Sequence, residues 1–389
     1  MELCLYDPLY GYYSRTSNQF GKAGDFYTAS DIHAVFGRLL ARQFEEMWRA
    51  LDRPLQLEIL ELGPGRGLFA RDLLDWSEKK FPAFFVALTY TLQERPPALR
   101  AKLAENLAAH ISRGKAVLSQ PGNTSLRDTS VEMRLAASPA VQDPPAQEPQ
   151  YKIHRSCQPE TPLIVFANEF FDALPVEILS AQGKLHLGYQ GSGYEGSRLT
   201  EIWLPPSADE LEFLDRYSFL PEPGERLEVP LAAQRWVDAV AAEIGCGFLI
   251  IIDYGYTRGE QLAGRHRGTL MAYRQHSAIS DPYQAPGEQD LTAHVNFTAI
   301  AAAAERAGMR PQKLVTQAQF LMGIGEPNQF ADPFEECGLP QERAKVALQL
   351  KHLISPTGMG ETFHVLVSSR GVEAGRVATL SGLQFGKGV

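Results

Sequence analysis

Residues 57–67 constrain the fold of this chain more than any other stretch. They read Leu-Glu-Ile-Leu-Glu-Leu-Gly-Pro-Gly-Arg-Gly, so an apolar run containing the acid Glu61 ends in three alternating glycines, Gly63, Gly65 and Gly67. The periodic segment 68–76 then predicts a helix. A strand, a tight turn and a helix start form the unit with which an open α/β sheet binds a nucleotide-like ligand beyond its strand ends. Glycine suits such a turn because it has no Cβ to obstruct the ligand.

The spacing of these glycines separates the nucleotide-binding classes. A dinucleotide fingerprint needs glycine where this chain has Leu68, and a P-loop needs Gly-Lys-Ser/Thr, which is absent. The pattern acid-x-Gly-x-Gly-x-Gly is similar to motif I of class I methyltransferases, which bind S-adenosyl-L-methionine. The motif alone leaves open a glycine-rich turn of another α/β enzyme.

Composition excludes several other classes. The 389 residues carry a formal net charge of −9, so we expect no positive field for binding nucleic acid. No apolar stretch approaches the length of a membrane span, which argues against membrane insertion. The four cysteines form no C-x-x-C pair, and the N-terminus has neither a signal nor a transit pattern. These features predict a cytoplasmic protein.

Strand-like and helix-like segments alternate along the chain, which predicts an α/β fold with a doubly wound, mostly parallel sheet. Strands are expected at 57–62, 84–93, 116–118, 163–167, 247–253, 312–316 and 362–368. Helices are expected at 32–47, 67–79, 98–110, 232–244, 297–307, 317–323 and 340–353, with Asn296 capping the helix at 297. Two alternating runs, 184–189 and 199–204, predict an antiparallel insertion with its turn at 191–196.

These elements suggest a division of the chain. Residues 1–50 are expected to form an N-terminal lid and helix, and residues 51–176 and 246–369 the core. Residues 120–160 are polar and proline-rich, which predicts a mobile loop. The remaining ranges are an inserted β-rich and helical region on the substrate side, 177–245, and a C-terminal tail, 370–389.

Polar residues follow several of the predicted strands, where a ligand of such a sheet lies. Glu94 follows the second strand, and a carboxylate there can accept both hydroxyl protons of a ribose. Glu61 can orient the methionine end of the cofactor. For both acids a structural role, as a solvated helix-start residue or a cap of the glycine turn, stays open.

The segment Asn168-Glu169-Phe170-Phe171-Asp172 carries the predicted chemistry. Methyl transfer is an in-line displacement, so the enzyme must mainly position the attacking lone pair. If the nucleophile is a guanidinium, the carboxylates Glu169 and Asp172 can localise its charge and help to remove a proton. Phe170 or Phe171 can stack on the guanidinium plane. The alternative is that the acids cap a helix start and the phenylalanines belong to the core.

Other kinds of site are not indicated. His276 and His294 fall in one polar region but lack the fixed spacing of metal ligands, so we expect no metal. They are interpreted as residues near the substrate. No Gly-x-Ser-x-Gly elbow supports a hydrolase.

Several stretches together resemble one family, the MidA-type methyltransferases, which include a mitochondrial complex I assembly factor that methylates an arginine. The most specific are Asn-Glu-Phe-Phe-Asp-Ala-Leu-Pro at 168–175 and Gln-Asp-Leu-Thr-Ala-His at 289–294. Further matches lie at 3–13, 24–28, 61–67, 252–256, 268–270 and 358–363.

This resemblance implies a seven-stranded, Rossmann-like class I methyltransferase sheet and S-adenosyl-L-methionine as cofactor. Cofactor contacts are implied at the glycine loop, at Glu94, around Asn168 and in the N-terminal segment that includes Gly24, Asp25 and Thr28. Catalytic roles are expected for Asn168, Glu169 and Asp172. Substrate contacts are expected at Phe170, Phe171, Asp253, Tyr254 and His294.

The leading hypothesis is a protein arginine methyltransferase whose partner is a protein such as a respiratory complex I subunit. Two alternatives remain. One is a non-catalytic assembly factor that retains a cofactor pocket, and the other is a small-molecule N-methyltransferase. The sequence does not determine the oligomeric state.

Overall fold

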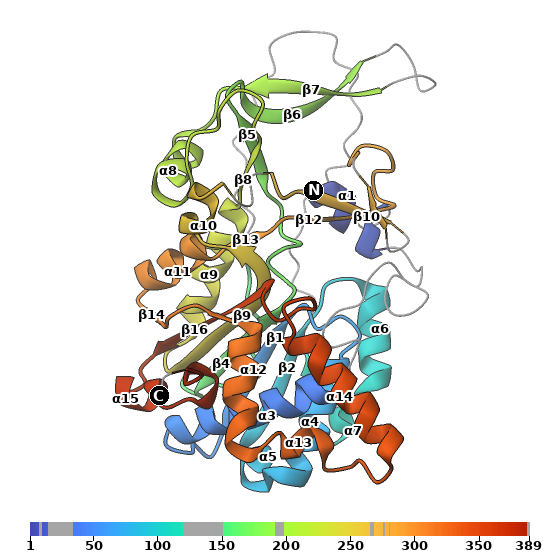
Figure 1. Cartoon of the computed structure of the whole chain (residues 1–389), viewed down its shortest axis with the longest axis vertical. Helices are drawn as coiled ribbons and strands as arrows, with labels where there is room; N and C mark the ends of the chain where they lie inside the picture. The colour runs from blue at the N-terminus through green and yellow to red at the C-terminus, as the bar shows by residue number, and fades with distance from the viewer. Residues whose placement is uncertain are drawn as a thin grey trace.

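A computed structural model of the chain is drawn in Figure 1. It describes residues 1–7, 10–14, 34–119, 151–190, 198–264, 268–274, 277–279 and 281–386. Gly24, Asp25, Thr28 and His276 lie outside these residues, as do positions 120–150 of the predicted loop.

A central sheet organises the fold. Its strands are β1 Leu57–Leu62, β2 Leu88–Gln93, β3 Ala116–Leu118, β4 Leu163–Asn168, β9 Gly247–Tyr256, β13 Val295–Asn296, β14 Arg310–Pro311, β15 Val315–Thr316 and β16 Phe363–Arg370. The main path runs β14-β16-β9-β4-β1-β2-β3, with β13 beside β9 and β15 beside β16. The strands from β9 to β3 pair in parallel, whereas β16 is antiparallel to β9. The predicted seven-stranded, mostly parallel sheet is confirmed as this main path.

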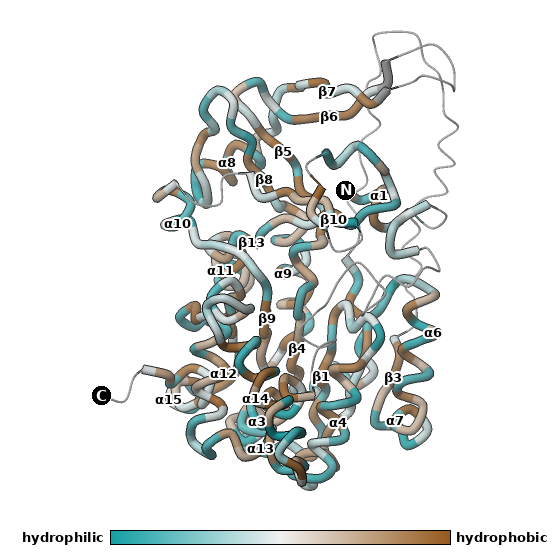
Figure 2. The backbone as a smooth tube through the Cα atoms, turned by 45° about the vertical axis from the view of Figure 1, so that its right-hand side comes forward, coloured by the Kyte–Doolittle hydropathy of each residue, from teal (hydrophilic) through white to brown (hydrophobic). Residues whose placement is uncertain are grey.

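Helices cover both faces of this sheet. One face packs against α3 Ala34–Ala50, α4 Leu68–Lys80, α5 Pro82–Ala87, α12 Gln317–Gly325 and α14 Pro340–Ile354. The other packs against α9 Leu231–Glu243 and α11 Phe297–Arg306. Successive strand residues serve opposite faces, so Ile59 lies in the first core and Leu60 in the second. Burial on both faces explains why β4 and residues 248–252 of β9, at the centre of the sheet, are apolar runs, as the tube in Figure 2 shows.

The insertion after β4 forms a separate antiparallel sheet. Its order is β7-β6-β5-β8, with β5 Glu177–Ser180, β6 Gly183–Gln190, β7 Arg198–Leu204 and β8 Leu227–Val229. The predicted antiparallel pair is confirmed by the register of β6 and β7, and its expected turn lies outside the described residues. Helix α8, Ala208–Tyr217, begins with a capping box between Ser207 and Glu210. Helix α9, which follows this sheet, packs against the central sheet.

The N-terminal segment lies beside a third sheet. Helix α1, Glu2–Tyr6, and the 3-10 turn η1, Tyr12–Ser14, share a small core with this sheet, formed by Leu5, Tyr12, Ala272 and Leu291. The sheet order is β11-β10-β12, with β10 Met271–Arg274, β11 Ser277–Ile279 and β12 Asp290–Thr292. Figure 1 places α1 next to β10 and β12.

The remaining elements are short. They are α6 Pro97–Asn106, α7 Ala108–Ser112, α10 Arg258–Leu262, η2 Glu326–Asn328, α13 Ala331–Phe334, α15 Ala374–Ala378 and η3 Ser381–Leu383.

Three predicted elements differ from the structure. In place of the strand expected at 312–316 there are two short strands, β14 and β15. The strand expected at 84–93 begins only at Leu88, because Pro82 occupies the first turn of α5, where proline favours a helix. The helix expected at 98–110 is interrupted at Leu107 and becomes α6 and α7. The predicted cap is confirmed, since Asn296 Oδ1 accepts the backbone N–H of Ala299 at 3.1 Å.

Candidate functional site

The glycine loop after β1 adopts left-handed backbone angles at Gly63, Gly65 and Gly67, with φ of 65°, 55° and 73°. A Cβ on Gly63 would lie 2.9 Å from the Phe170 ring, and one on Gly67 2.8 Å from Leu103. A Cβ on Gly65 would meet no atom within 4 Å. Gly63 and Gly67 therefore allow close packing, whereas Gly65 borders open space.

Glu94 joins this loop to the end of β2. Its Oε2 accepts the backbone N–H of Gly65 at 2.7 Å, and its Oε1 accepts that of Arg95 at 2.9 Å. Burial raises the pKa of Glu94 to about 7. Each carboxylate oxygen can accept more than one hydrogen bond, so both oxygens can also receive a ribose hydroxyl.

Glu61 lies beneath the loop and is buried. Its Oε2 accepts the hydroxyl proton of Tyr90 at 2.9 Å. Burial raises the pKa of Glu61 to about 8, although the hydrogen bond from Tyr90 opposes that rise. The described contact of Glu61 is thus a structural one within the sheet.

The turn after β4 brings Asn168, Glu169 and Asp172 together. Glu169 has a φ of 50°, which is uncommon outside glycine, and its N–H donates to Ile252 O at 3.0 Å. Asn168 Nδ2 donates to Glu169 Oε1 at 3.2 Å. Asn168 Oδ1 is buried and has no hydrogen-bond partner among the described residues. Such an oxygen can accept a hydrogen bond from a donor outside the chain, either a water or a ligand.

Asp172 lies deeper in the same turn and is only 6% exposed. Its Oδ2 accepts the Tyr254 hydroxyl proton at 2.5 Å, and its buried Oδ1 has no partner in the described part of the chain. Burial raises the pKa of Asp172 to about 6. The ring of Tyr254 also lies against His294, with ring centroids 5.2 Å apart. Tyr254 therefore borders Asp172, and His294 packs against Tyr254.

Asp253, for which the sequence predicts a substrate contact, binds the backbone of the turn at Asn168–Asp172. It is fully buried, and its Oδ2 accepts the backbone N–H groups of Phe170, Phe171 and Asp172 at 3.0–3.3 Å. Burial and the charges of Asp172 and Glu169 raise its pKa, while these amides oppose that rise. Asp253 holds the turn in place.

The two phenylalanines of the turn have different environments. Phe171 is 3% exposed and belongs to the core that α9 and α11 cover, and its contact with substrate stays a prediction. Phe170 is half-buried, with its ring against Gly63 and edge-on to Trp236, at a centroid distance of 5.2 Å. Of the two rings, only that of Phe170 borders the glycine loop.

The sequence did not reveal the tyrosines Tyr6, Tyr13 and Tyr90, nor Asp290, as neighbours of these acids. Tyr13 donates to Asp290 across 277 positions, a separation at which no local pattern can act as a signal. Tyr90 lies on β2, and the pairing of β2 with β1, which the sequence analysis did not predict, places it close to Glu61.

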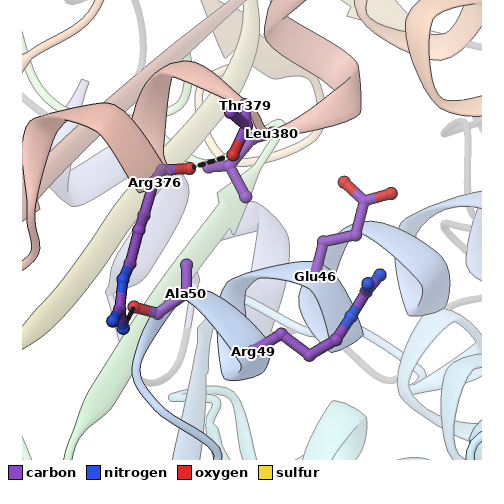
Figure 3. Close-up of a pocket in the computed structure, with 6 residues that line it drawn as sticks. All are labelled: Glu46, Arg49, Ala50, Arg376, Thr379 and Leu380. Carbon is purple, nitrogen blue, oxygen red and sulfur yellow. Dashed lines mark hydrogen bonds between the residues drawn. The ribbon is translucent and has the colours of Figure 1, made fainter.

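A surface hollow lies elsewhere, between α3 and α15 (Figure 3). It is lined by Glu46, Arg49, Ala50, Arg376, Thr379 and Leu380. Helix α3 ends at Ala50, shortly before β1 starts, so this hollow lies at the amino ends of the parallel strands. It is therefore separate from the site at the carboxyl ends.

A model of the family described as "Putative S-adenosyl-L-methionine-dependent methyltransferase" matches residues 39–315. The chain belongs to this methyltransferase family. Its cofactor is S-adenosyl-L-methionine, and the residues fit that molecule: Gly65 borders open space, Glu94 can accept ribose hydroxyls, and the buried Asn168 Oδ1 needs a donor.

Individual relatives agree with this assignment. The chain is 28% identical to a Drosophila melanogaster protein named protein arginine methyltransferase NDUFAF7 homolog, mitochondrial, over 96% of this chain and 81% of the relative. The human protein arginine methyltransferase NDUFAF7, mitochondrial, is 25% identical over 97% and 80%. A Burkholderia thailandensis protein of the COG1565 superfamily, solved with S-adenosyl-homocysteine, matches with a TM-score of 0.72, 26% identity and coverage of 96% and 87%.

The comparisons contradict one expectation. The fly, mouse and human relatives are named mitochondrial, so the predicted cytoplasmic location is wrong as an inference from this sequence. Within the described residues no helix is long and apolar enough to cross a membrane. The same residues contain no group of His, Cys, Asp and Glu side chains arranged to hold a metal ion.

Proposed function

We propose that this methyltransferase acts on an arginine side chain of a partner protein. The observation that carries the proposal is the buried Asp172 carboxyl, which keeps one oxygen without a described partner in the same turn as Glu169. A guanidinium presents a planar set of N–H donors that suits such carboxylates. The names of the relatives, which align over nearly the whole chain, support the same target class.

The residues of the turn after β4 would have separate roles in methyl transfer. When bound, the cofactor supplies a methyl group on a positively charged sulfur; an N–C bond forms as the C–S bond breaks. The guanidinium releases one proton for each methyl group that it gains. Glu169 and Asp172 hold the guanidinium and accept this proton, and Asn168 Oδ1 accepts a hydrogen bond that fixes the reactants. Phe170, beside Gly63, offers a ring for the guanidinium plane.

The family resemblance extends the proposal to the partner, which we take to be a respiratory complex I subunit. The test incubates the purified chain with methyl-labelled cofactor and a cell extract that contains complex I, followed by mass spectrometry of the labelled proteins. We expect labelled methylarginine in one protein. Label on another residue type or on a small molecule would contradict the proposal, and cofactor binding without any transfer would favour a non-catalytic assembly factor.

A further inference from the structure

The N-terminal segment contacts the region around Asp172 and Asp290, near the carboxyl ends of the parallel strands. The Tyr6 hydroxyl donates to the backbone oxygen of Ala173, directly after Asp172, at 3.0 Å. The Tyr13 hydroxyl donates to Asp290 Oδ1 at 2.9 Å, and the two tyrosine rings lie 5.5 Å apart. Tyr6 and Tyr13 thus contact the chain directly after Asp172 and Asp290, respectively, which the sequence places far apart.

Asp290 lies beside the catalytic turn. It starts β12, is 3% exposed, and its Oδ1 also accepts the backbone N–H of Leu291 at 2.9 Å. The chain just after β12 returns to the turn, since the N–H of Ala293 donates to Asp172 O at 3.0 Å. The backbone therefore fixes β12 against the segment that carries Asp172.

Electrostatics place the tyrosines among several carboxyls. Burial raises the pKa of Tyr13, and the charges of Asp290 and Asp172 raise it further. Burial likewise raises the pKa of Tyr6, followed by the charges of Asp290, Asp172 and Glu94. Both hydroxyls are consequently close to acids that follow different strands.

Carboxyls outnumber the basic groups described at this place. Asp172, Asp253, Asp290 and Glu94 are all at least nine-tenths buried. Arg95 lies over the Tyr6 ring at 5.6 Å, and Arg100 lowers the pKa of Glu94. Burying ionised acids in such excess is costly unless they are protonated or a cation joins them. The buried Oδ1 of Asp172, which lacks a partner among the described residues, independently indicates that a donor is missing.

We propose that Asp290 and Asp172 are the two buried carboxylates that bind the substrate guanidinium, beside the more exposed Glu169, and that Tyr13 holds Asp290 in position. This inference rests on the proposed arginine specificity. A guanidinium carries five N–H donors, enough to engage two carboxylates at once. The N-terminal segment then completes the substrate site, because its Tyr13 positions one of the two carboxylates.

The test compares Asp290→Asn, Tyr13→Phe and a control, Tyr10→Phe, whose side chain in the same segment is 69% exposed. Calorimetry measures the binding of N-acetyl-L-arginine amide to each protein saturated with S-adenosyl-homocysteine. We expect the affinity for the arginine derivative to fall about tenfold or more in Asp290→Asn and less in Tyr13→Phe, as for loss of a charge-assisted contact. The control and the affinity for S-adenosyl-homocysteine should stay within about twofold of the wild type.

The carboxylate site and the proposed arginine specificity can fail separately, because different measurements test them. Unchanged binding of the arginine derivative by Asp290→Asn, or no binding by the wild type, would overturn the two-carboxylate site even if the wild type labels arginine in the extract. Label on a different residue type would instead overturn the arginine specificity itself. If Asp290→Asn does not fold, Tyr13→Phe decides, because it removes one hydroxyl and leaves the charge of Asp290 in place.

Discussion

The backbone N–H of Gly65 donates to Oε2 of Glu94 at 2.7 Å, which joins the loop after β1 to the end of β2. The neighbouring N–H of Gly63 donates to Gln93 O at 3.0 Å, so the loop is held at two adjacent positions. This arrangement fixes the loop before a ligand arrives, and a fixed site loses less conformational entropy on binding. The carboxylate that is proposed to accept the ribose therefore also sets the shape of the glycine loop.

Replacing Gly65 with valine should abolish cofactor binding. The φ of 55° disfavours a β-branched residue, and the new side chain would project into the open space beside the loop. We expect an affinity loss of about 100-fold or more, measured by calorimetry with S-adenosyl-L-methionine. Gly114→Val is a matched control, because Gly114 has a φ of 69°, also borders open space and lies outside the site. Equal losses of cofactor affinity in Gly65→Val and Gly114→Val would mean that backbone strain, and not a blocked cofactor site, causes the effect.

Cofactor affinity should depend on pH through Glu94. Because burial raises its pKa to about 7, the carboxyl is largely protonated at pH 6 and ionised at pH 8. Only the ionised form accepts hydrogen bonds at both oxygens without donating one. Affinity should therefore increase as the pH rises from 6 to 8, by up to about tenfold per unit below the pKa.

Glu94→Gln provides the comparison for that titration. Because glutamine stays neutral, the variant should bind the cofactor more weakly than the wild type, and its affinity should change less with pH. Because the pKa of Glu61 is also raised, to about 8, the titration is repeated in Glu61→Gln. A pH dependence that survives in Glu94→Gln and disappears in Glu61→Gln would assign the titration to Glu61.

Glu169→Gln should separate binding from turnover. The substitution keeps the size of the side chain and removes the charge that helps to take up the guanidinium proton. We expect turnover to fall by about 10²–10⁴-fold, measured as labelled methyl transfer, with cofactor affinity almost unchanged. Glu160→Gln, at an exposed position before β4, is the matched control. Full activity of Glu169→Gln would remove Glu169 from its proposed role.

The sequence could predict the features that depend on local pattern. The β1 turn and the Asn168–Asp172 turn were recognised because an apolar strand followed by glycines or acids is contiguous in the chain. Residues 84–87 were wrongly assigned to the second strand because Phe-Phe-Val-Ala is apolar in a way that suits either a buried strand or a packed helix. In the structure Phe84 and Phe85 pack into the core from α5.

The roles of individual acids required the three-dimensional structure. Asp253 lies near the end of β9 and Glu94 directly follows β2, and the sequence gives no sign that each of them accepts backbone N–H groups of a distant turn. The contact between Tyr13 and Asp290 depends on how α1, η1 and β12 pack, through Leu5, Tyr12 and Leu291. Such packing is not encoded in any short segment.

Tyr254→Phe should shift the pH profile of methyl transfer. The Tyr254 hydroxyl donates to Asp172 Oδ2, and this bond lowers the pKa of Asp172, which burial otherwise raises to about 6. Without the bond the pKa of Asp172 should rise further. If ionised Asp172 accepts the proton of the guanidinium, activity falls when Asp172 becomes protonated. The acid limb of the pH profile should therefore lie about one pH unit higher in the variant than in the wild type. The measurement is kcat/KM between pH 5 and 9.

Tyr217→Phe is the control for this prediction. It loses a hydrogen bond from Arg306 at 2.7 Å in the insertion and should keep the wild-type pH profile. An unshifted acid limb in Tyr254→Phe would exclude Asp172 as the group that governs it.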